Sequence, residues 1–211
     1  MFYIVGLGNP GEEYINTRHN TGRMAILKLA KDLEAPEFVF NKKANALISE
    51  TKIGKEKLTL ILPETFMNKS GNAVSYFVKP LVKVKAASAK ATSSQRKGLE
   101  NLIVVHDDLD LPLETLKISY NKGVGGHRGL DSVRKAVKTL EFVRVRIGIS
   151  PATSKGRAKK PEGEQKVLDF ILGKFKPTET DTMKKIFKKS SEAMQSIIAD
   201  GRDRAMNVYN S

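Results

Sequence analysis

The chain has 211 residues, a size typical of one α/β domain with a substantial core, and we expect residues 1–211 to form a single domain. It contains no cysteine, which excludes disulfides, a thiolate nucleophile and a cysteine-ligated zinc site, and no apolar run is long enough to cross a membrane. Lys and Arg number 37 against 23 Asp and Glu, giving a net charge of +14, which favours a polyanionic partner.

The basic residues are not concentrated on one amphipathic helix with bulky aromatics opposite, so nucleic acid is a better candidate partner than a membrane surface. A basic surface that only keeps the protein soluble is the alternative. The N-terminus has strand character and lacks the charged leader and apolar stretch of a signal sequence. We therefore expect a soluble, unprocessed, cytoplasmic protein.

The first predicted strand, at 2–5, runs into a glycine-rich loop at 6–11 whose glycines match the G-x-G-x-x-G spacing of a dinucleotide site. Such a site requires a helix that begins inside the glycines and a second strand that ends in an acidic residue about 20 residues later. Residues 12–20 are polar without an apolar stripe, and the helical period begins only at about 21–33. We therefore expect no nucleotide cofactor, and a loop whose backbone can approach a ligand closely.

The next part of the chain alternates predicted strands with helices. Two strands are expected at 44–49 and 58–62, joined by a tight turn. The loop 63–69 leads into a helix that Ser70 is expected to cap. Residues 83–98 are rich in Lys, Ala and Ser without apolar periodicity, so we predict a flexible basic loop there.

The second half continues this alternation, starting with an apolar run at 102–105 that is typical of a central strand. We expect the polar residues that follow this run to lie at the strand end; they are His106, Asp107, Asp108 and Asp110. A strand at 116–120, a glycine-rich loop at 121–129 and a helix at about 130–140 follow. Next comes a strand at 143–149 with Arg144 and Arg146 on its polar face, and then a second flexible basic segment at 150–163. Helices at about 164–173 and 178–200 complete the chain, and Gly201 is expected to end the last one. Strands interleaved with helices predict an α/β fold, with a twisted mixed β-sheet flanked by helices.

The sequence lacks G-x-S-x-G, H-E-x-x-H and Walker motifs, so serine acyl transfer, zinc proteolysis and phosphoryl transfer lack their usual marks. Only His19, His106 and His127 can titrate near neutral pH. A base for ester hydrolysis needs a carboxylate on its second ring nitrogen, and His19 with Asp107 fits because both follow apolar strands whose ends can meet at one edge of the sheet. A loop histidine bonded to backbone is the alternative. We expect His106 to be structural and the other acidic residues after 102–105 to be turn and cap carboxylates.

Five sequence blocks recur in an order that matches one known family. They are GLGNPGEEYINTRHN at 6–20, PETFMNKSG at 63–71, VHDDLDLP at 105–112, GGHRGL at 125–130 and RVRIGI at 144–149. Together they span about residues 1–175 and resemble bacterial-type peptidyl-tRNA hydrolase, a match more specific than any single motif. The resemblance implies the α/β architecture and an esterase that cleaves the bond between a peptide and the 3′-terminal ribose of tRNA, recycling tRNA from peptidyl-tRNA released prematurely in translation.

The resemblance also implies roles for residues in the site. His19 activates the water and Asp107 supports it, while Asn9 anchors the first peptide unit. The substrate backbone near the ester is expected to contact Phe66, Met67 and Asn68. From residue type alone, Asn9 and Asn68 are equally typical turn formers.

Four more residues are expected to bind substrate or tRNA. Tyr14 stacks or hydrogen-bonds at the 3′-terminal nucleotide, although its residue type equally suits a half-buried core tyrosine. His127 lines the cleft without being the base, and Arg146 orients cleft groups or meets phosphate. Where the family usually has Gly-His-Asn-Gly, this chain has Arg128 in place of Asn, and Arg can donate but cannot accept a hydrogen bond.

Arg128 either stabilises the oxyanion or binds phosphate. We favour phosphate, because the loop glycines allow an outward turn and a permanent positive charge beside a histidine base would weaken that base. The basic loops 83–98 and 155–160 are expected to contact tRNA phosphates; the first is longer than is usual in the family.

We expect neither a metal nor an organic cofactor, and a monomer that binds peptidyl-tRNA through its 3′ end and phosphate backbone. The alternative function is a family relative that has lost catalysis and acts as an RNA-binding module. The presence of Asn9, His19, Asn68 and Asp107 argues against this alternative, and Arg128 argues mildly for it.

Overall fold

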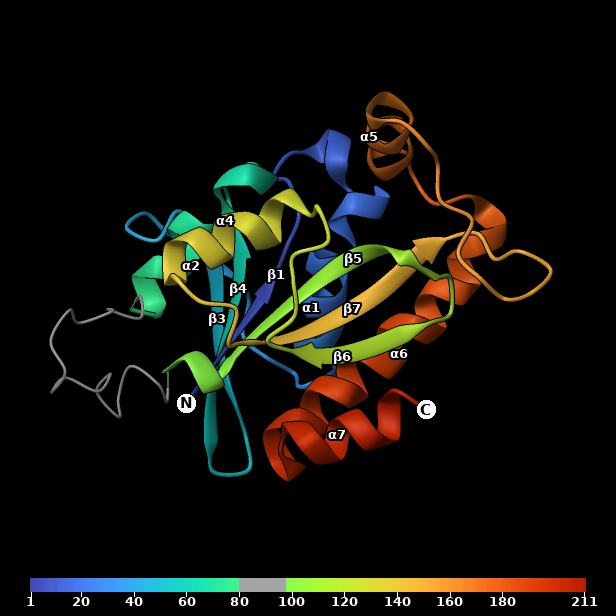
Figure 1. Cartoon of the computed structure of the whole chain (residues 1–211). Coiled ribbons are helices and arrows are strands. Elements are labelled where there is room, and N and C mark those ends of the chain that lie inside the picture. The colour runs from blue at the N-terminus through green and yellow to red at the C-terminus, as the bar shows by residue number, and fades with distance from the viewer. Residues whose placement is uncertain (80–97) are drawn as a thin grey trace, which may run out of the picture.

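The computed structural model describes residues 1–79 and 98–211, so nearly all of the basic loop predicted at 83–98 lies outside the described residues. Among the described residues, seven strands form one twisted sheet in the order β2-β3-β4-β1-β5-β7-β6 (Figure 1). The strands are β1 (Phe2–Gly6), β2 (Val39–Asn41), β3 (Ala46–Ile53), β4 (Glu56–Pro63), β5 (Leu102–Pro112), β6 (Leu116–Tyr120) and β7 (Val143–Ser150).

The four central strands β4, β1, β5 and β7 are parallel, and the remaining pairings are antiparallel. The sheet is therefore mixed, as predicted. The central strand β1 is apolar on both sides, since a parallel sheet is covered by helices on both faces. Its residues Ile4 and Val5 are both fully buried but belong to separate cores on opposite faces of the sheet.

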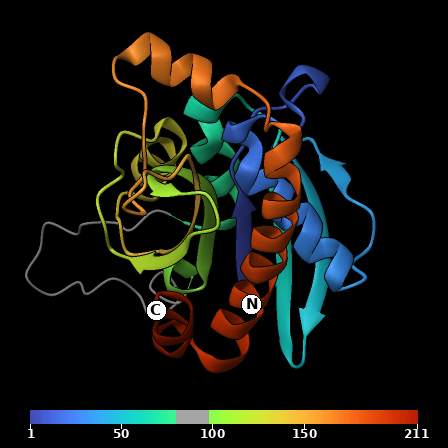
Figure 2. The ribbon, with the colours of Figure 1, turned by 90° about the vertical axis from the view of Figure 1, so that its right-hand side faces the viewer.

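Helices cover each face of the sheet (Figure 2). One face is packed by α1 (Thr21–Asp32), α6 (Pro177–Asp200) and α7 (Arg202–Tyr209), and the other by α2 (Ser70–Phe77) and α4 (Arg128–Val137). The α/β class is thus confirmed. No helix of the described chain is both long and apolar enough to span a bilayer.

Three predicted boundaries in the second half are wrong, and one helix was not predicted. β5 continues to Pro112 because it pairs alongside β7, so His106, Asp107, Asp108 and Asp110 lie within the strand and not beyond it. α4 begins at Arg128, inside the predicted loop, because His127 caps it. Gly201 ends α6 as expected, but a further helix, α7, follows it. β7 takes in Ser150, which was assigned to the irregular segment.

The first half needs smaller corrections. The short edge strand β2 was not predicted, since a run of three residues is below the length at which alternation is recognisable. Ser70 is the first residue of α2 and not its cap: its hydroxyl donates to the carbonyl oxygen of Met67 at 2.9 Å.

The segment after β7 leads to α5 (Glu164–Leu172), which lies apart from the two helix layers (Figure 1). Residues 151–163 are irregular apart from a bridge between Ala152 and Ala158. α5 has no buried residue, yet its apolar side faces the cleft at the carboxyl ends of the parallel strands. In α/β sheets this is the edge at which ligands bind.

Candidate active site

A cleft of about 770 Å³ opens at this edge of the sheet. It is lined by all ten of the site residues predicted from the sequence: Asn9, Tyr14, His19, Phe66, Met67, Asn68, Asp107, His127, Arg128 and Arg146. They come from five separate stretches of chain that the strand ends bring together. None of the described residues that line the cleft is Ser, Thr or Cys, so the cleft offers no side chain of the usual nucleophilic types.

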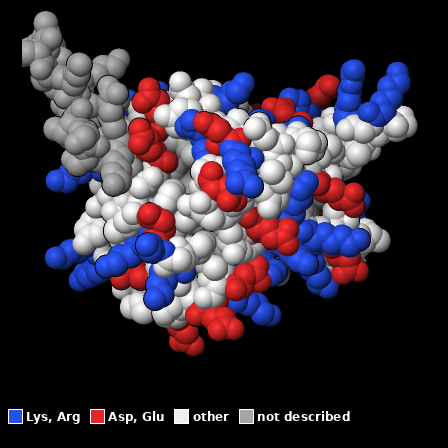
Figure 3. All heavy atoms as spheres, turned by 90° about the horizontal axis from the view of Figure 1, so that it is seen from below, with Lys and Arg blue, Asp and Glu red and all other residues white. Residues whose placement is uncertain are grey.

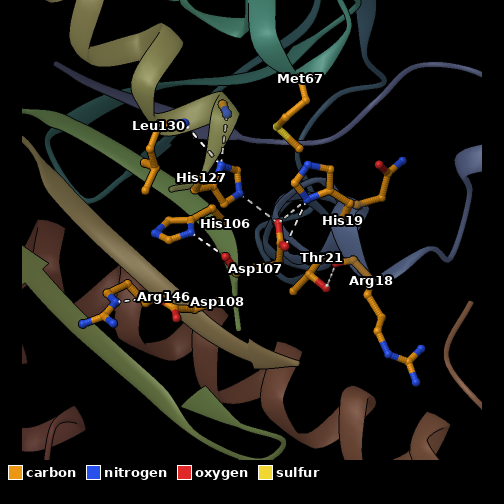
Figure 4. Close-up of polar contacts among 12 residues, drawn as sticks. Arg18, His19, Thr21, Met67, His106, Asp107, Asp108, His127, Leu130 and Arg146 are labelled. Carbon is orange, nitrogen blue, oxygen red and sulfur yellow. Dashed lines mark hydrogen bonds and ion pairs between the residues drawn. The ribbon is translucent and has the colours of Figure 1, made fainter. Parts of the chain in front are cut away.

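His19 and Asp107 meet in the cleft although 88 positions separate them (Figure 4). The Nδ1 atom of His19 lies 3.0 Å from each carboxylate oxygen of Asp107. Because a carboxylate can only accept, Nδ1 carries the proton and donates it, which leaves Nε2 with a free lone pair. This is the tautomer that a general base requires.

His127 also contacts Asp107, through Nε2 at 3.0 Å from Oδ1. Its Nδ1 atom accepts hydrogen bonds from the backbone N–H groups of Gly129 and Leu130, at 3.1 and 3.3 Å. Since backbone N–H groups can only donate, Nδ1 is unprotonated and Nε2 donates to Asp107. Both ring nitrogens of His127 are therefore occupied, and His19 is the histidine with a nitrogen available as a base.

The Asp107 carboxylate lies between these two imidazoles and is almost fully buried. Burial alone would raise the pKa of its carboxyl, but the neighbouring His19 and His127 hold the pKa well below its usual range. Asp107 is thus ionised at any working pH. Its negative charge would stabilise an imidazolium formed at His19.

His106 is fully buried beside this group. Its Nδ1 lies 2.6 Å from the backbone oxygen of Asp107, and Nε2 has no partner within the described residues. Burial, and then the nearby His127, hold the pKa of His106 well below its usual range. His106 is therefore a neutral residue that supports the Asp107 backbone, in keeping with the structural role expected from the sequence.

His19 is positioned by a short 3-10 helix, η2 (Arg18–Asn20), directly before α1. A Cβ atom on Gly22 would lie 2.2 Å from the carbonyl oxygen of Val105, so only glycine lets α1 start this close to β5. The close approach brings His19 against Asp107, two residues beyond Val105. The Thr21 hydroxyl donates to the Arg18 carbonyl at 2.7 Å and holds the turn (Figure 4).

Asn9 connects the loops that follow β1 and β4. Its side-chain oxygen accepts from the backbone N–H of Met67 at 2.8 Å. Its own backbone N–H and C=O are bonded to the side chain of Asn20 at 2.8 and 2.9 Å. The Asn9 side-chain NH₂ has no partner in the part of the chain that the structure describes, which leaves it as a donor for a ligand.

Aromatic and amide side chains line the cleft beside Asn9. Tyr14, in η1 (Glu12–Tyr14), and Phe66 meet edge-on with ring centroids 6.4 Å apart. Phe66 is 57% exposed, and Asn68 is exposed in the 3-10 helix η3 (Met67–Lys69). Met67 is buried. It contributes to the cleft through its backbone N–H, which donates to Asn9, and through its thioether side chain (Figure 4).

Basic residues line the opposite side of the cleft. Arg146 on β7 donates through Nε to Asp108 at 2.7 Å and is half-buried. Arg128 is exposed over 63% of its side chain and pairs with Glu164 of α5 at 2.9 Å. It therefore turns outward to α5 and makes no contact with His19.

Several cleft residues were not singled out from the sequence. Lys122 lines the basic side, as does Arg144, which is buried and donates to the Gly123 carbonyl at 2.8 Å; Lys160, from the basic segment expected to contact tRNA, lies there too. Burial, and then the charge of Arg146, lower the pKa of Arg144 to about 10. α5 contributes Val167, Leu168, Ile171 and Leu172. Their helical spacing was visible, but the sequence does not reveal which surface an amphipathic helix covers.

His19, Asp107 and His127 are also the group of described residues whose ligand atoms lie close enough together to hold a metal, within 4.8 Å of one another. In the geometry observed, both imidazoles donate N–H groups to the carboxylate. A metal would have to displace both protons and rotate the rings. The arrangement suits proton transfer better than metal binding.

The fold and the site fit one class of protein: an α/β enzyme with a histidine whose Nε2 is free and whose Nδ1 contacts a buried carboxylate, an arrangement that suits hydrolysis. Residues 3–211 match the family model "Peptidyl-tRNA hydrolase". The chain belongs to this family.

Similar proteins agree over the full length. The chain is 37% identical over 214 residues to a peptidyl-tRNA hydrolase of Thermodesulfovibrio yellowstonii, covering 100% of this chain and 99% of the relative. It is 37% identical to that of Herpetosiphon aurantiacus, covering 100% and 90%. The crystal structure of peptidyl-tRNA hydrolase from Acinetobacter baumannii superposes with a TM-score of 0.83 at 27% identity, covering 100% and 95%. The family resemblance noted in the sequence is confirmed.

Proposed function

We propose that this protein hydrolyses the ester that joins a peptide, or an N-blocked aminoacyl group, to the 3′-terminal ribose of tRNA, with His19 as the general base. Family membership makes the chain an aminoacyl-tRNA ester hydrolase. The observation that carries the residue assignment is the His19–Asp107 contact at 3.0 Å, which fixes Nδ1 as the protonated nitrogen and leaves Nε2 free.

In the proposed reaction, Nε2 of His19 takes a proton from a water molecule while the water oxygen attacks the ester carbonyl carbon. The imidazolium is stabilised by the ionised Asp107. As the ester C–O bond breaks, the ribose oxygen takes the proton from His19, giving a tRNA 3′ hydroxyl and a peptide carboxylic acid that loses its remaining proton to solvent. No covalent intermediate forms. A positioned base of this kind contributes about 10²–10⁴-fold to the rate.

The order of the strands supports an orientation for the substrate. Asp107 is on β5; the amide and aromatic residues follow β1 and β4 on one side of it, and the basic residues lie on β7 and in the segments next to β6 and α5 on the other. We assign the peptide to the first side, where Asn9 and Asn68 can bind its backbone. The polyanionic tRNA takes the second side, with Arg146 near phosphate. Tyr14, which packs against Phe66 on the first side, stacks on the terminal nucleotide where the peptide and the tRNA meet.

We further propose that the enzyme acts as a monomer in the cytoplasm. Its substrate arises in translation. Light scattering at working concentration should give the mass of one chain, and activity that rises with self-association would contradict the proposal.

The decisive experiment compares N-acetyl-aminoacyl-tRNA with the unacetylated form. We expect hydrolysis of the first only, and a His19→Ala loss of about 10²–10⁴-fold in the chemical step with tRNA affinity nearly unchanged. Asp107→Asn should reduce the rate less. A protein that binds tRNA but hydrolyses neither substrate would instead be the RNA-binding module considered from the sequence. Near-full activity in His19→Ala would show that the base is misassigned.

A further inference from the structure

A second pocket, of about 460 Å³, opens on the other side of the loop that carries Asn9. Asn9 lines both this pocket and the cleft. The walls of the second pocket are mainly apolar: α1 contributes Met24 and Leu27, and the β2–β4 part of the sheet contributes Phe38, Leu47 and Leu62. We refer to it as the outer pocket.

The outer pocket lies beyond the amide and aromatic end of the cleft, on the side of the sheet that leads from β5 toward β2. Going from β5 through β1 to β4, the lining passes from His19 and Asp107 to Asn9 and Phe66. Continuing from β4 through β3 to β2, it becomes the apolar wall of the outer pocket. The basic residues of the cleft lie in the opposite direction, toward β7 and β6.

Asn9 is well placed to join the two spaces. Its oxygen is bonded to Met67 and its backbone to Asn20, which fixes its position, while the NH₂ group is left for a ligand. If the Asn9 NH₂ group holds a carbonyl of the substrate peptide, the rest of that peptide continues past Asn9, away from the basic side.

Exposed apolar side chains surround the outer pocket. Ile15 is 55% exposed and Leu27 47% exposed, and both are lining residues. Phe40 is 53% exposed and is paired across β2 and β3 with Leu47, a lining residue, so the two side chains lie on the same face of the sheet. A group of exposed apolar residues beside a hollow marks a binding surface.

The chemistry of the outer pocket does not suit RNA. Its one basic lining residue, Arg23, is already paired with Glu64 and donates to the Pro63 carbonyl at 3.0 Å. Glu12 adds a negative charge at the rim. An apolar pocket with no free positive charge among its described lining residues fits a peptide side chain and repels a phosphate.

From these observations we propose that the outer pocket binds apolar side chains of the peptide part of the substrate, upstream of the residue that is esterified to tRNA. This inference rests on the proposed function and adds a preference for apolar peptides, set by residues outside the reacting centre.

The test uses three substrates on one tRNA: N-acetyl-aminoacyl-tRNA, and peptidyl-tRNAs whose upstream residues are either Leu-Leu-Leu or Gly-Gly-Gly. Wild-type kcat/KM should be about tenfold higher for the leucine peptide than for the glycine peptide, the size expected for burying one large apolar side chain. Leu27→Lys and, separately, Ile15→Lys should remove most of this ratio and leave N-acetyl-aminoacyl-tRNA hydrolysis unchanged. Both positions are exposed, so the variants should fold.

Val39→Lys is the matched control. Val39 is 67% exposed on the edge strand β2 but is paired with Ile48 and points to the opposite face from Phe40, so its substitution should leave the ratio intact. Equal kcat/KM for the two peptides in the wild type, or a ratio that survives both Leu27→Lys and Ile15→Lys, would overturn the inference. A wild-type protein that fails on N-acetyl-aminoacyl-tRNA would instead refute the proposed function.

Discussion

At the scale of single residues, two histidines contact one carboxylate and differ in what their other ring nitrogen contacts. Nδ1 of His127 is committed to the first turn of α4, where it accepts from Gly129 and Leu130. His19 has no such commitment on Nε2 among the described residues. Residue type alone cannot distinguish the two, because the distinction is made by the backbone that each one faces.

The buried His106 predicts a dependence of stability on pH. Its pKa is held well below the usual value near 6.5 by burial and by His127. Below about pH 6.5 the unfolded chain binds a proton at this residue and the folded protein does not, so the free energy of unfolding falls as the pH falls. The slope is up to about 1.4 kcal/mol per pH unit for one such group.

Urea denaturation at pH 7.5 and pH 5.5 measures this dependence. His106→Gln should lose less stability between the two pH values than the wild type, although its stability at pH 7.5 will be lower. Identical losses in the two proteins would show that His106 does not set the dependence.

Arg128 predicts a second test at this scale. Its guanidinium is turned to Glu164 and makes no contact with His19, so it should serve tRNA binding and not the oxyanion. We expect Arg128→Ala to bind tRNA more weakly, with a shallower salt dependence, and to keep its single-turnover rate at saturating substrate. Glu164→Gln, which frees Arg128, should bind at least as tightly as the wild type. A lost chemical step with intact binding would assign Arg128 to the oxyanion.

At the scale of elements, Arg18 joins the histidine-bearing helix η2 to the chain between α5 and α6. Its guanidinium donates to Glu179 at 2.7 Å and to the Lys174 carbonyl, and lies between the rings of Phe170 and Phe175 at 4.7 and 4.8 Å. Arg18 and Glu179 are both largely buried, with side chains 5% and 12% exposed. One side chain thus fixes the turn beside His19 and the end of α5.

Removing Arg18 leaves the Glu179 carboxylate buried without its partner. We expect Arg18→Ala to lower the free energy of unfolding by about 3–5 kcal/mol, the usual cost of breaking a buried pair. The double variant Arg18→Ala/Glu179→Ala should recover part of that loss, because the unpaired charge is gone. Denaturant titration of the wild type, of each single variant (Arg18→Ala and Glu179→Ala) and of the double variant measures both effects, and strictly additive losses would mean that the pair is not coupled.

At the scale of the whole molecule, the net charge of +14 is not spread as a uniform positive coat. The face seen from the side of α7 carries Lys and Arg interspersed with Asp and Glu (Figure 3). The cleft itself has unequal sides, because strand order separates its basic residues from its amide and aromatic residues. An extended substrate with one polyanionic end is therefore favoured to bind in one orientation, with that end on the basic side.

The exposed basic residues between β7 and α5 should contribute to tRNA binding through its phosphates. Changing Lys155, Arg157 and Lys159 to Gln should reduce the log–log salt slope of tRNA binding by about one unit for each phosphate that is no longer neutralised. Lys185→Gln and Lys188→Gln, exposed on α6 and away from the cleft, are the control and should leave the slope unchanged. If both sets behave alike, the segment is merely solvated.

The sequence by itself determined the alternation of strands and helices, the mixed sheet and the identity of the residues that converge on the cleft. Apolar periodicity reports burial directly, which is why it gave the alternation of elements. Most of the cleft residues, such as Asn9, Phe66 and Asn68, were identified through the resemblance to a known family. The pairing of His19 with Asp107 followed from the argument that the ends of apolar strands can meet at one edge of the sheet, and the structure brings the two within hydrogen-bond distance.

Tertiary structure alone decided the rest. Periodicity ended β5 at Val105, but pairing with β7 extends the strand to Pro112 through residues that are polar. α4 begins at Arg128 and is capped by His127, whereas Ser, Thr, Asp and Asn are the usual caps, so the sequence contains no recognisable capping signal for this start. The roles of Arg18, α5 and the outer pocket depend on contacts between segments far apart in the chain, such as residues 18 and 179. Local patterns record which side of an element is buried, but the partner that buries it is chosen only when the whole chain packs.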